Sequence, residues 1–136
     1  MNEQTAHPDE QPLVWIVDCE QWPRASLRAE LIERGYDTVG YIALGPVLSA
    51  LHGTSTRKPR VLVVDLRGQS VAEPDFEKLA TADVPIVLIG GSVELQHPGV
   101  AVRKWAAVLK RPITLGEIAD EVRRIIAGSR RQPRGG

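Results

Sequence analysis

Residues 61–68 read VLVVDLRG, and this stretch decides the fold that the sequence predicts. Four apolar residues in succession indicate a strand that is covered on both faces, as in a parallel sheet. Asp65 ends the run, and the carboxyl ends of parallel strands open into the crevice where doubly wound sheets bind ligands. The stretch therefore predicts a buried strand with an acidic side chain in a binding crevice.

Two further apolar runs have the same character. Residues 13–17 (LVWIV) lead into Asp18, and residues 85–89 (PIVLI) form the third run. Because these runs alternate with amphipathic segments, we expect parallel strands joined by crossover helices. Asp18 and Asp65 are then both expected at the carboxyl end of the sheet.

The segments between the runs carry helical patterns. Residues 24–34 place apolar side chains on one helical face, and residues 115–126 do so after a capping-box pattern formed by Thr114 and Glu117. Weaker patterns predict the remaining elements: helices at 46–51 and 74–80, a second strand at 36–42, and a short helix followed by a loop at 92–105.

The composition fits one compact α/β domain. The chain has 136 residues, of which 43% are hydrophobic and 25% charged, which is enough to bury a core. We expect the domain at residues 13–127, with a disordered tail at 1–12 and a basic flexible tail at 128–136, because neither end can offset its ordering entropy by packing. Three arginines in the second tail could touch nucleic acid or an acidic partner, but a solvated end is the favoured interpretation: Arg130, Arg131 and Arg134.

The charge balance excludes some partners. Lys and Arg together number 17, as do Asp and Glu, so the formal net charge is zero and no global field attracts nucleic acid or a membrane. Cys19 is the single cysteine, no apolar run is long enough to span a membrane, and no leader pattern is seen at the amino end. We therefore expect a cytoplasmic protein that meets nucleic acid only through an output domain or a partner.

Four short motifs, in the same order along the chain, resemble those of bacterial response-regulator receiver domains. They are VDCE at 17–20, ERGYDTV at 33–39, VVDLRG at 63–68 and LKRPITLGEI at 109–118. The resemblance covers nearly all of the expected domain. It implies a flavodoxin-like (βα)5 doubly wound parallel sheet in the order 2-1-3-4-5, here with a short or irregular fourth helix. It also implies a role in two-component (phosphorelay) signal transduction, with a histidine kinase or another signalling protein as partner and a homodimer as a further option.

The resemblance also assigns roles to the acids. In receivers an aspartate attacks a phosphoryl donor, while Mg²⁺ neutralises charge on the phosphoryl oxygens. Asp65 would be the phospho-acceptor and a metal ligand. Asp18 and the backbone carbonyl of Arg67 would be the other protein groups near the ion.

Two further segments are expected to contact the phosphoryl group. Lys110 is the candidate for the lysine that pairs with this group in receivers, although Arg111 stands directly before Pro112, where receivers normally place that lysine. The backbone amides of Gly90 and Gly91 could approach a phosphate, because glycine has no side chain in the way.

The departures from the receiver pattern are equally informative. Cys19 stands where receivers have a second acid, and a thiol suits Mg²⁺ poorly, so any Mg²⁺ binding should be weak. Gly90 stands where receivers have the Ser or Thr whose hydroxyl binds the phosphoryl group. Ala107 or Val108 stands where receivers have the aromatic residue that responds to that hydroxyl. We therefore expect an atypical receiver, a protein-interaction module with weakened or absent phosphorylation switching.

Alternatives to this hypothesis stay open. One is a working receiver that a histidine kinase phosphorylates on Asp65, and another is a small-ligand-binding domain of flavodoxin-like topology. Asp18 and Asp65 could also be acids that only cap turns. An enzyme is not expected and no catalytic residue is assigned, because the three histidines and the single cysteine form no pattern of nucleophile and base.

Overall fold

The computed structural model describes residues 10–54 and 57–131, with the backbone alone for 130 and 131. The parts expected as tails at 1–9 and 132–136 lie outside this description. Five parallel strands form one sheet in the order β2-β1-β3-β4-β5, which confirms the expected topology. The strands are β1 (Leu13–Val17), β2 (Asp37–Tyr41), β3 (Val61–Asp65), β4 (Ile86–Gly90) and β5 (Ala107–Lys110).

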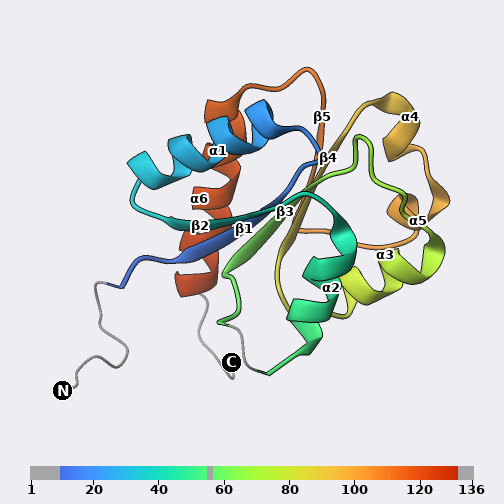
Figure 1. Ribbon diagram of the computed structural model, residues 1–136, viewed down its shortest axis with the longest axis horizontal. Helices are drawn as coiled ribbons and strands as arrows, with labels where there is room; N and C mark the ends of the chain where they lie inside the picture. Colours follow the sequence, from blue (N-terminus) through green and yellow to red (C-terminus); the bar gives the residue numbers. More distant parts are fainter. Residues whose placement is uncertain (1–9, 55–56, 132–136) are drawn as a thin grey trace.

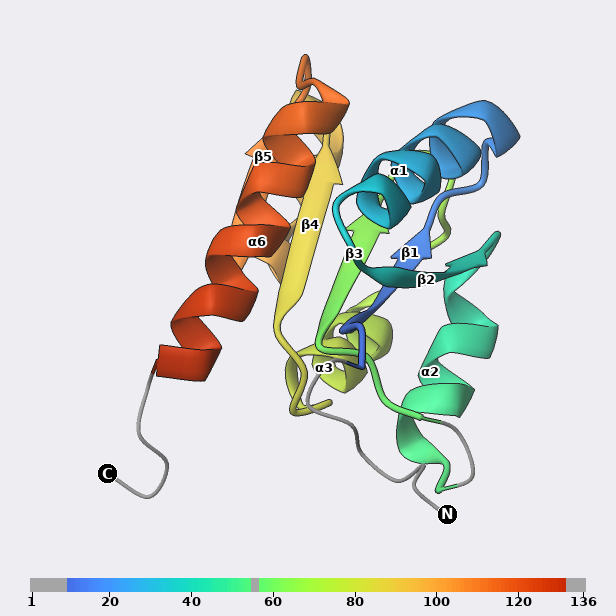
Figure 2. The same ribbon diagram turned by 90° about the vertical axis from the view of Figure 1, so that its left-hand side faces the viewer.

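Helices cover both faces of the sheet. Figures 1 and 2 show α1 (Gln21–Glu33) and α6 (Leu115–Arg131) together on one face, with α2 (Leu44–His52) and α3 (Glu73–Ala80) on the other. Two shorter helices, α4 (Ser92–Leu95) and α5 (Pro98–Ala101), complete the second layer. None of the helices in the described part of the chain combines the length and hydrophobicity that a membrane span needs.

Strand side chains alternate between two apolar cores, one beneath each helical layer. Successive side chains of a strand point to opposite faces, so Asp18 follows the direction of Ile16, and Asp65 that of Val63. Both acids are thereby directed to the face that α1 and α6 cover. The strand residues of that core are Val14, Ile16, Val61, Val63, Val87 and Ile89.

The fourth crossover is irregular, as expected. It consists of α4 and α5, which have four residues each, in place of one full helix. The Nδ1 atom of His97 accepts a hydrogen bond from the Gly99 N–H at 2.9 Å and so caps α5 at its first residue, Pro98. The sequence predicted the short α4 but placed a loop where α5 forms.

Two long helices differ in extent from their predictions. Helix α1 begins at Gln21 rather than at residue 24, with Pro23 in the first turn, where its missing N–H leaves no intrahelical bond unmade. The capping box of α6 forms as predicted, since Thr114 and Glu117 exchange hydrogen bonds of 2.9 and 3.0 Å. Helix α6 then continues to Arg131, beyond the expected end of the domain at residue 127.

Candidate functional site

Asp18 and Asp65 lie at the carboxyl ends of β1 and β3, which pair in parallel. Both are buried, with 4% and 7% of their surface exposed. Each side chain accepts a hydrogen bond from the backbone two residues on, Asp18 from Glu20 at 2.9 Å and Asp65 from Arg67 at 3.0 Å. These are the turn-capping contacts of aspartate, and they fix the direction of both carboxylates.

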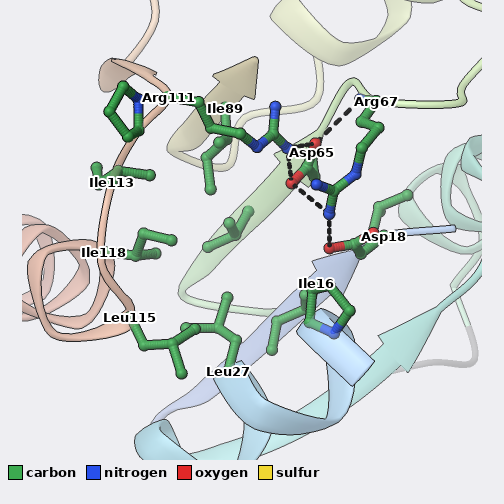
Figure 3. A pocket seen from close by; sticks show the side chains of 14 residues that line it. Ile16, Asp18, Leu27, Asp65, Arg67, Ile89, Arg111, Ile113, Leu115 and Ile118 are labelled. Carbon is green, nitrogen blue, oxygen red and sulfur yellow. Dashed lines mark hydrogen bonds and ion pairs between the residues drawn. The ribbon is translucent and has the colours of Figure 1, made fainter. Parts of the chain in front are cut away.

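The Arg67 side chain lies between the two acids. Its Nη2 atom is 3.4 Å from Oδ2 of Asp18 and 3.6 Å from Oδ2 of Asp65 (Figure 3). Its Nε atom is 3.6 Å from Oε2 of Glu20. From the sequence, only the backbone carbonyl of Arg67 was expected at the site. The sequence signal for its side chain is a basic residue two positions after an acid at the end of a strand, which is near enough for the side chain to reach that acid.

Arg111 forms the second ion pair of the site. Its Nη2 atom contacts both carboxylate oxygens of Asp65 (Figure 3). Ala107 and Leu109 pack against the core under α1 and α6, so alternation along β5 directs Arg111 to that side and Lys110 to the other. Lys110 is exposed and does not line the cavity beside the acids. Lys110 was expected to contact a phosphoryl group, with Arg111 as the other candidate for that position; in the structure it is Arg111 that lies against Asp65.

The Glu94 side chain packs against Gly90 and Gly91. Its Oε1 atom accepts the Gly91 N–H at 2.6 Å and lies 3.7 Å from Nη1 of Arg111. A Cβ atom on Gly90 would come within 3.2 Å of Glu94, so the missing side chain makes room for this carboxylate. The Gly91 amide, which we expected to be available to a phosphate, already has an anionic partner.

No aromatic side chain takes the place expected at residue 107 or 108. Ala107 packs against the core under α1 and α6, whereas Val108 is exposed. Trp105 packs against the other core, and its Nε1–H donates to the Val100 carbonyl at 3.0 Å. Neither residue 107 nor residue 108 therefore supplies the aromatic side chain that responds to a phosphoryl group in receivers.

Cys19 joins the turns after β1 and β3. Its Sγ atom donates to the backbone carbonyl of Arg67 at 3.3 Å. Gly68 follows with φ +72°, and a Cβ atom there would lie 2.4 Å from the Cys19 Sγ. Glycine is thus required at residue 68 both by the backbone conformation and by the close approach of the sulfur.

These contacts do not fit a Mg²⁺ site. Mg²⁺ needs oxygen ligands in near-octahedral geometry, but a guanidinium lies between the two carboxylates. The Arg67 carbonyl, expected as a ligand, accepts a hydrogen bond from Cys19. Within residues 10–54 and 57–131, no three His, Cys, Asp or Glu side chains gather as metal ligands. The positive charge of the site comes instead from Arg67 and Arg111.

Burial and neighbouring charges act in opposite directions on the groups of this site. Burial raises the pKa of Asp18 and the charge of Asp65 adds to the rise, whereas the hydrogen bond from Glu20 and the charge of Arg67 lower it; the net direction is upward. Burial lowers the pKa of Arg67, but the charges of Asp65, Asp18 and Glu20 outweigh it, so the pKa of Arg67 rises. Arg67 therefore stays charged, and ionised Asp18 carries an energetic cost.

A cavity of about 350 Å³ opens beside the ion pairs, between the sheet and the layer of α1 and α6 (Figure 3). Two acids and two arginines line one end: Asp18, Asp65, Arg67 and Arg111. The other lining residues are all apolar: Ile16, Val17, Pro23, Leu27, Val63, Ile89, Pro112, Ile113, Leu115 and Ile118.

Comparison with known proteins identifies the fold. Neither a family model nor a curated protein matches the sequence. The signal receiver domain of a putative LuxO repressor protein from Vibrio parahaemolyticus has a TM-score of 0.71 at 13% identity, over 89% of this chain and 94% of that one. The receiver domain of the Francisella response regulator 1452 has a TM-score of 0.71 at 16% identity, over 88% and 99%. A response regulator receiver protein from Sinorhizobium medicae gives 0.69 at 18% identity, over 87% and 96%.

This chain has the receiver fold. The receiver fold brings three of the expected groups together at the carboxyl edge of the sheet, namely Asp18, Asp65 and the backbone of Arg67. It separates Lys110 and Val108 from them, because both point to the opposite face of β5. Two side chains that the sequence analysis did not assign to the site, those of Arg67 and Glu94, complete it.

Proposed function

We propose that this chain is an atypical receiver, a cytoplasmic signalling and protein-interaction module of a two-component (phosphorelay) system. In this proposal ion pairs with Arg67 and Arg111 occupy the carboxylates of Asp18 and Asp65. Phosphorylation then does not efficiently change the conformation of the chain. The observation that carries the proposal is the contact of Asp65 with two guanidinium groups, those of Arg111 and Arg67. The receiver fold of the structural neighbours supports the signalling role.

Phosphorylation of Asp65 would require the ion pairs to open. An acceptor carboxylate needs a free oxygen for in-line attack, and the transferred group needs cations around its oxygens. Both oxygens of Asp65 are engaged by Arg111. Arg67 is a poor substitute for a metal ion, because Asp18 and Glu20 also hold its guanidinium.

The surroundings of the acid also disfavour a phosphoryl switch. Gly90 offers no hydroxyl to bind a phosphoryl group, and the carboxylate of Glu94 stands over it. The negative charge of Glu94, which lies 3.7 Å from the Arg111 guanidinium that holds Asp65, would repel a phosphoryl group on Asp65. The response of β4 and β5 that a phosphoryl group triggers in receivers would therefore be weak here.

Two exposed apolar side chains at the starts of α1 and α6 support an interaction role. Trp22, in the first turn of α1, is 80% exposed, and Leu115 at the start of α6 is partly exposed at the cavity mouth. Exposed tryptophan is enriched at protein interfaces. We propose a histidine kinase or another signalling protein as the partner, with a second copy of this chain as a further candidate. Any contact with nucleic acid would be made by an output domain or a partner.

Intact-mass spectrometry tests the proposal directly. The purified chain and Asp65→Asn are incubated with acetyl phosphate, with and without Mg²⁺, beside an ordinary receiver domain as positive control. We expect the control to gain one phosphoryl group and this chain to gain none.

A second candidate function would be established by the opposite result. Arg111 contacts Asp65 from the position directly before Pro112, where receivers have a phosphoryl-contacting lysine. This observation favours a working receiver that a histidine kinase phosphorylates on Asp65. A Mg²⁺-dependent mass gain that Asp65→Asn loses would overturn the first proposal in favour of this one.

A further inference from the structure

The sheet ends at β2, and the outer edge of this strand carries unused hydrogen-bonding groups. Strand β2 pairs with β1 on one side only, and Figure 2 shows it at the border of the sheet between α1 and α2. We infer that this edge binds an extended, acidic segment of a partner protein as an additional strand. The inference goes beyond the proposed function, because the acidic site at Asp65 takes no part in it.

The backbone of β2 directs alternate residues outward. In a parallel pair, every second residue uses both its N–H and its C=O toward the neighbouring strand. Asp37, Val39 and Tyr41 are these residues in β2, since the N–H of Asp37 and the C=O of Tyr41 both bond to residues that flank β1. Thr38 and Gly40 therefore face outward. No hydrogen bond within the described part of the chain uses the N–H of either residue or the C=O of Gly40. An added strand pairs with such groups.

Two arginines of α1 give one face of this edge a positive charge. Gly40 has no side chain, and a Cβ atom there would lie 3.1 Å from Cδ of Arg28 and 3.2 Å from Cδ of Arg24, so both alkyl stems lie over the strand. Arg28 donates to the Thr38 hydroxyl at 3.0 Å. Arg24 donates to the backbone carbonyl of Asp18 at 2.8 Å. All the hydrogen bonds that these guanidiniums make within the described residues end on neutral oxygens, so donors remain for a carboxylate.

The other face of the edge is apolar. Side chains alternate along a strand, so Val39 and Tyr41 lie on the α2 side, opposite to the arginines. A groove of about 560 Å³ is lined by these two residues and by Trp15 of β1, and Thr38 lines it from the α1 side. Because residues from both faces of β2 line one groove, the groove lies at the free edge of the strand.

The arginines and the groove together define the segment that fits. Arg57, the cation that lines the groove, is 3.7 Å from Glu10 and 3.5 Å from Asp37, so it is already paired. An added strand would direct alternate side chains to the two faces. Acidic side chains would meet Arg28 and Arg24, and apolar side chains would meet the groove. We therefore expect a partner segment in which acidic and apolar residues alternate.

A second copy of this chain fits the edge less well. Two β2 strands would pair antiparallel about a twofold axis perpendicular to the sheet, which places both α1 helices on the same face. The arginines of the two copies would then share that face, and like charges on neighbouring strands are destabilising. We expect sedimentation to show no association through this edge. A dimer that Val39→Asp dissociates would overturn the inference in favour of a second copy.

Isothermal titration calorimetry of the full chain with short peptides tests the inference. The probe is acetyl-GEVEVEG-amide. One control, acetyl-GKVKVKG-amide, reverses the charge, and the other, acetyl-GEEEVVG-amide, keeps the composition but loses the alternation. We expect saturable binding of the probe and an affinity lower by about tenfold or more for each control. Absence of saturable binding at about 1 mM probe, or equal affinity for the three peptides, would overturn the inference.

Amide hydrogen exchange, followed by NMR, locates the bound peptide. The N–H groups of Thr38 and Gly40 should exchange about tenfold more slowly in the complex, because they gain partners. The N–H of Val39 is the internal control, since it already faces β1 and should change little. Unchanged exchange at Gly40 in the saturated complex would contradict strand addition.

Substitutions on the two faces test each contact. Arg28→Gln and Val39→Asp should each weaken probe binding about tenfold, whereas Arg28→Lys keeps the charge and should lose less. The matched controls, Arg123→Gln and Val102→Asp, change exposed residues outside the groove and should bind as the unmodified chain does. If circular dichroism shows that Arg28→Gln does not fold, Val39→Asp decides. Unchanged binding by folded Val39→Asp would refute the inference. Failure of the probe to bind would leave the signalling proposal untouched, because the acetyl phosphate measurement tests that proposal separately.

Discussion

Arg111 contacts both carboxylate oxygens of Asp65 across β4, the strand that separates β3 from β5. The backbone N–H of Arg111 also donates to the Gly90 carbonyl at the end of β4, at 2.9 Å. One residue thus connects the ends of three strands. The ion pair of the candidate site is also a structural link at the carboxyl edge of the sheet, so its removal has a predictable cost.

Arg111→Ala should lower the free energy of unfolding by about 2 kcal/mol, because the buried carboxyl group of Asp65 would lose its hydrogen bonds to Arg111 and keep only the longer contact with Arg67. Urea unfolding at neutral pH measures this change. The neighbouring variant Lys110→Ala is the control, since an exposed side chain away from the site should change stability by less than about 0.5 kcal/mol. Equal losses in the two variants would show that the Asp65 contact contributes nothing.

Asp18→Asn should gain stability relative to the unmodified chain as the pH rises from the ordinary aspartate pKa of 3.8 towards neutrality. Burial raises the pKa of Asp18, so the folded state prefers the protonated acid. The stability that protonated Asp18 contributes to the folded state is fully present below the unfolded pKa. This stability is lost as the pH rises through the raised pKa of the folded state. Urea unfolding at several pH values, with the exposed Asp83→Asn as control, measures the difference. A gain for Asp18→Asn that shrinks towards neutral pH would reverse the sign and refute the argument.

Gly68→Ala should destabilise the fold by about 2 kcal/mol or more, because residue 68 has a positive φ and its new Cβ would meet the Cys19 sulfur. Adding Cys19→Ala should restore only part of the loss, since it removes the clash and not the backbone strain. Thermal unfolding of both variants and of the double variant gives the coupling. Gly45→Ala is the control, because no atom lies within 4 Å of a Cβ at that position. Full rescue by Cys19→Ala would exclude the contribution of backbone strain.

Cys19→Asp combined with Arg67→Ala should create a Mg²⁺ site of millimolar-order affinity. The double variant supplies a further oxygen ligand and removes the guanidinium from between Asp18 and Asp65. Intrinsic tryptophan fluorescence during Mg²⁺ titration reports binding, because Trp22 lies in the first turn of α1. Each single variant should respond less than the double. An equal response by the unmodified chain would mean that Arg67 does not prevent metal binding.

The strands were predictable where burial is complete. β1 and β3 are covered on both faces, so their sequences are unbroken apolar runs whose limits can be read directly. β5 is an edge strand with half-buried and exposed positions in turn, and its short sequence does not define a register. The order of the strands came from the resemblance to receivers and not from periodicity. Helix α5 was missed because Pro98 and Gly99 are poor helix formers in mid-segment but are tolerated in a first turn.

The acids of the site were predictable, but the arginines were only partly so. Asp18 and Asp65 follow directly from the ends of buried strands, where the backbone fixes their positions. The choice between Lys110 and Arg111 depends on which side of the sheet each side chain takes at the end of β5, and the sequence alone left this open. Arg67 has a long flexible side chain. The position of its guanidinium between Asp18 and Asp65 depends on tertiary contacts, which the local sequence does not show.

The guanidinium of Arg67 differs from a dissolved ion because it is attached to the same turn as one of the acids that it neutralises. A tethered group acts at an effective concentration set by its short linker, of millimolar order or above, and dilution or a chelator cannot remove it. Free divalent ions would have to displace it rather than fill an open place. The charge balance at the end of β3 is therefore fixed when the chain folds and does not follow the ionic composition of the surroundings.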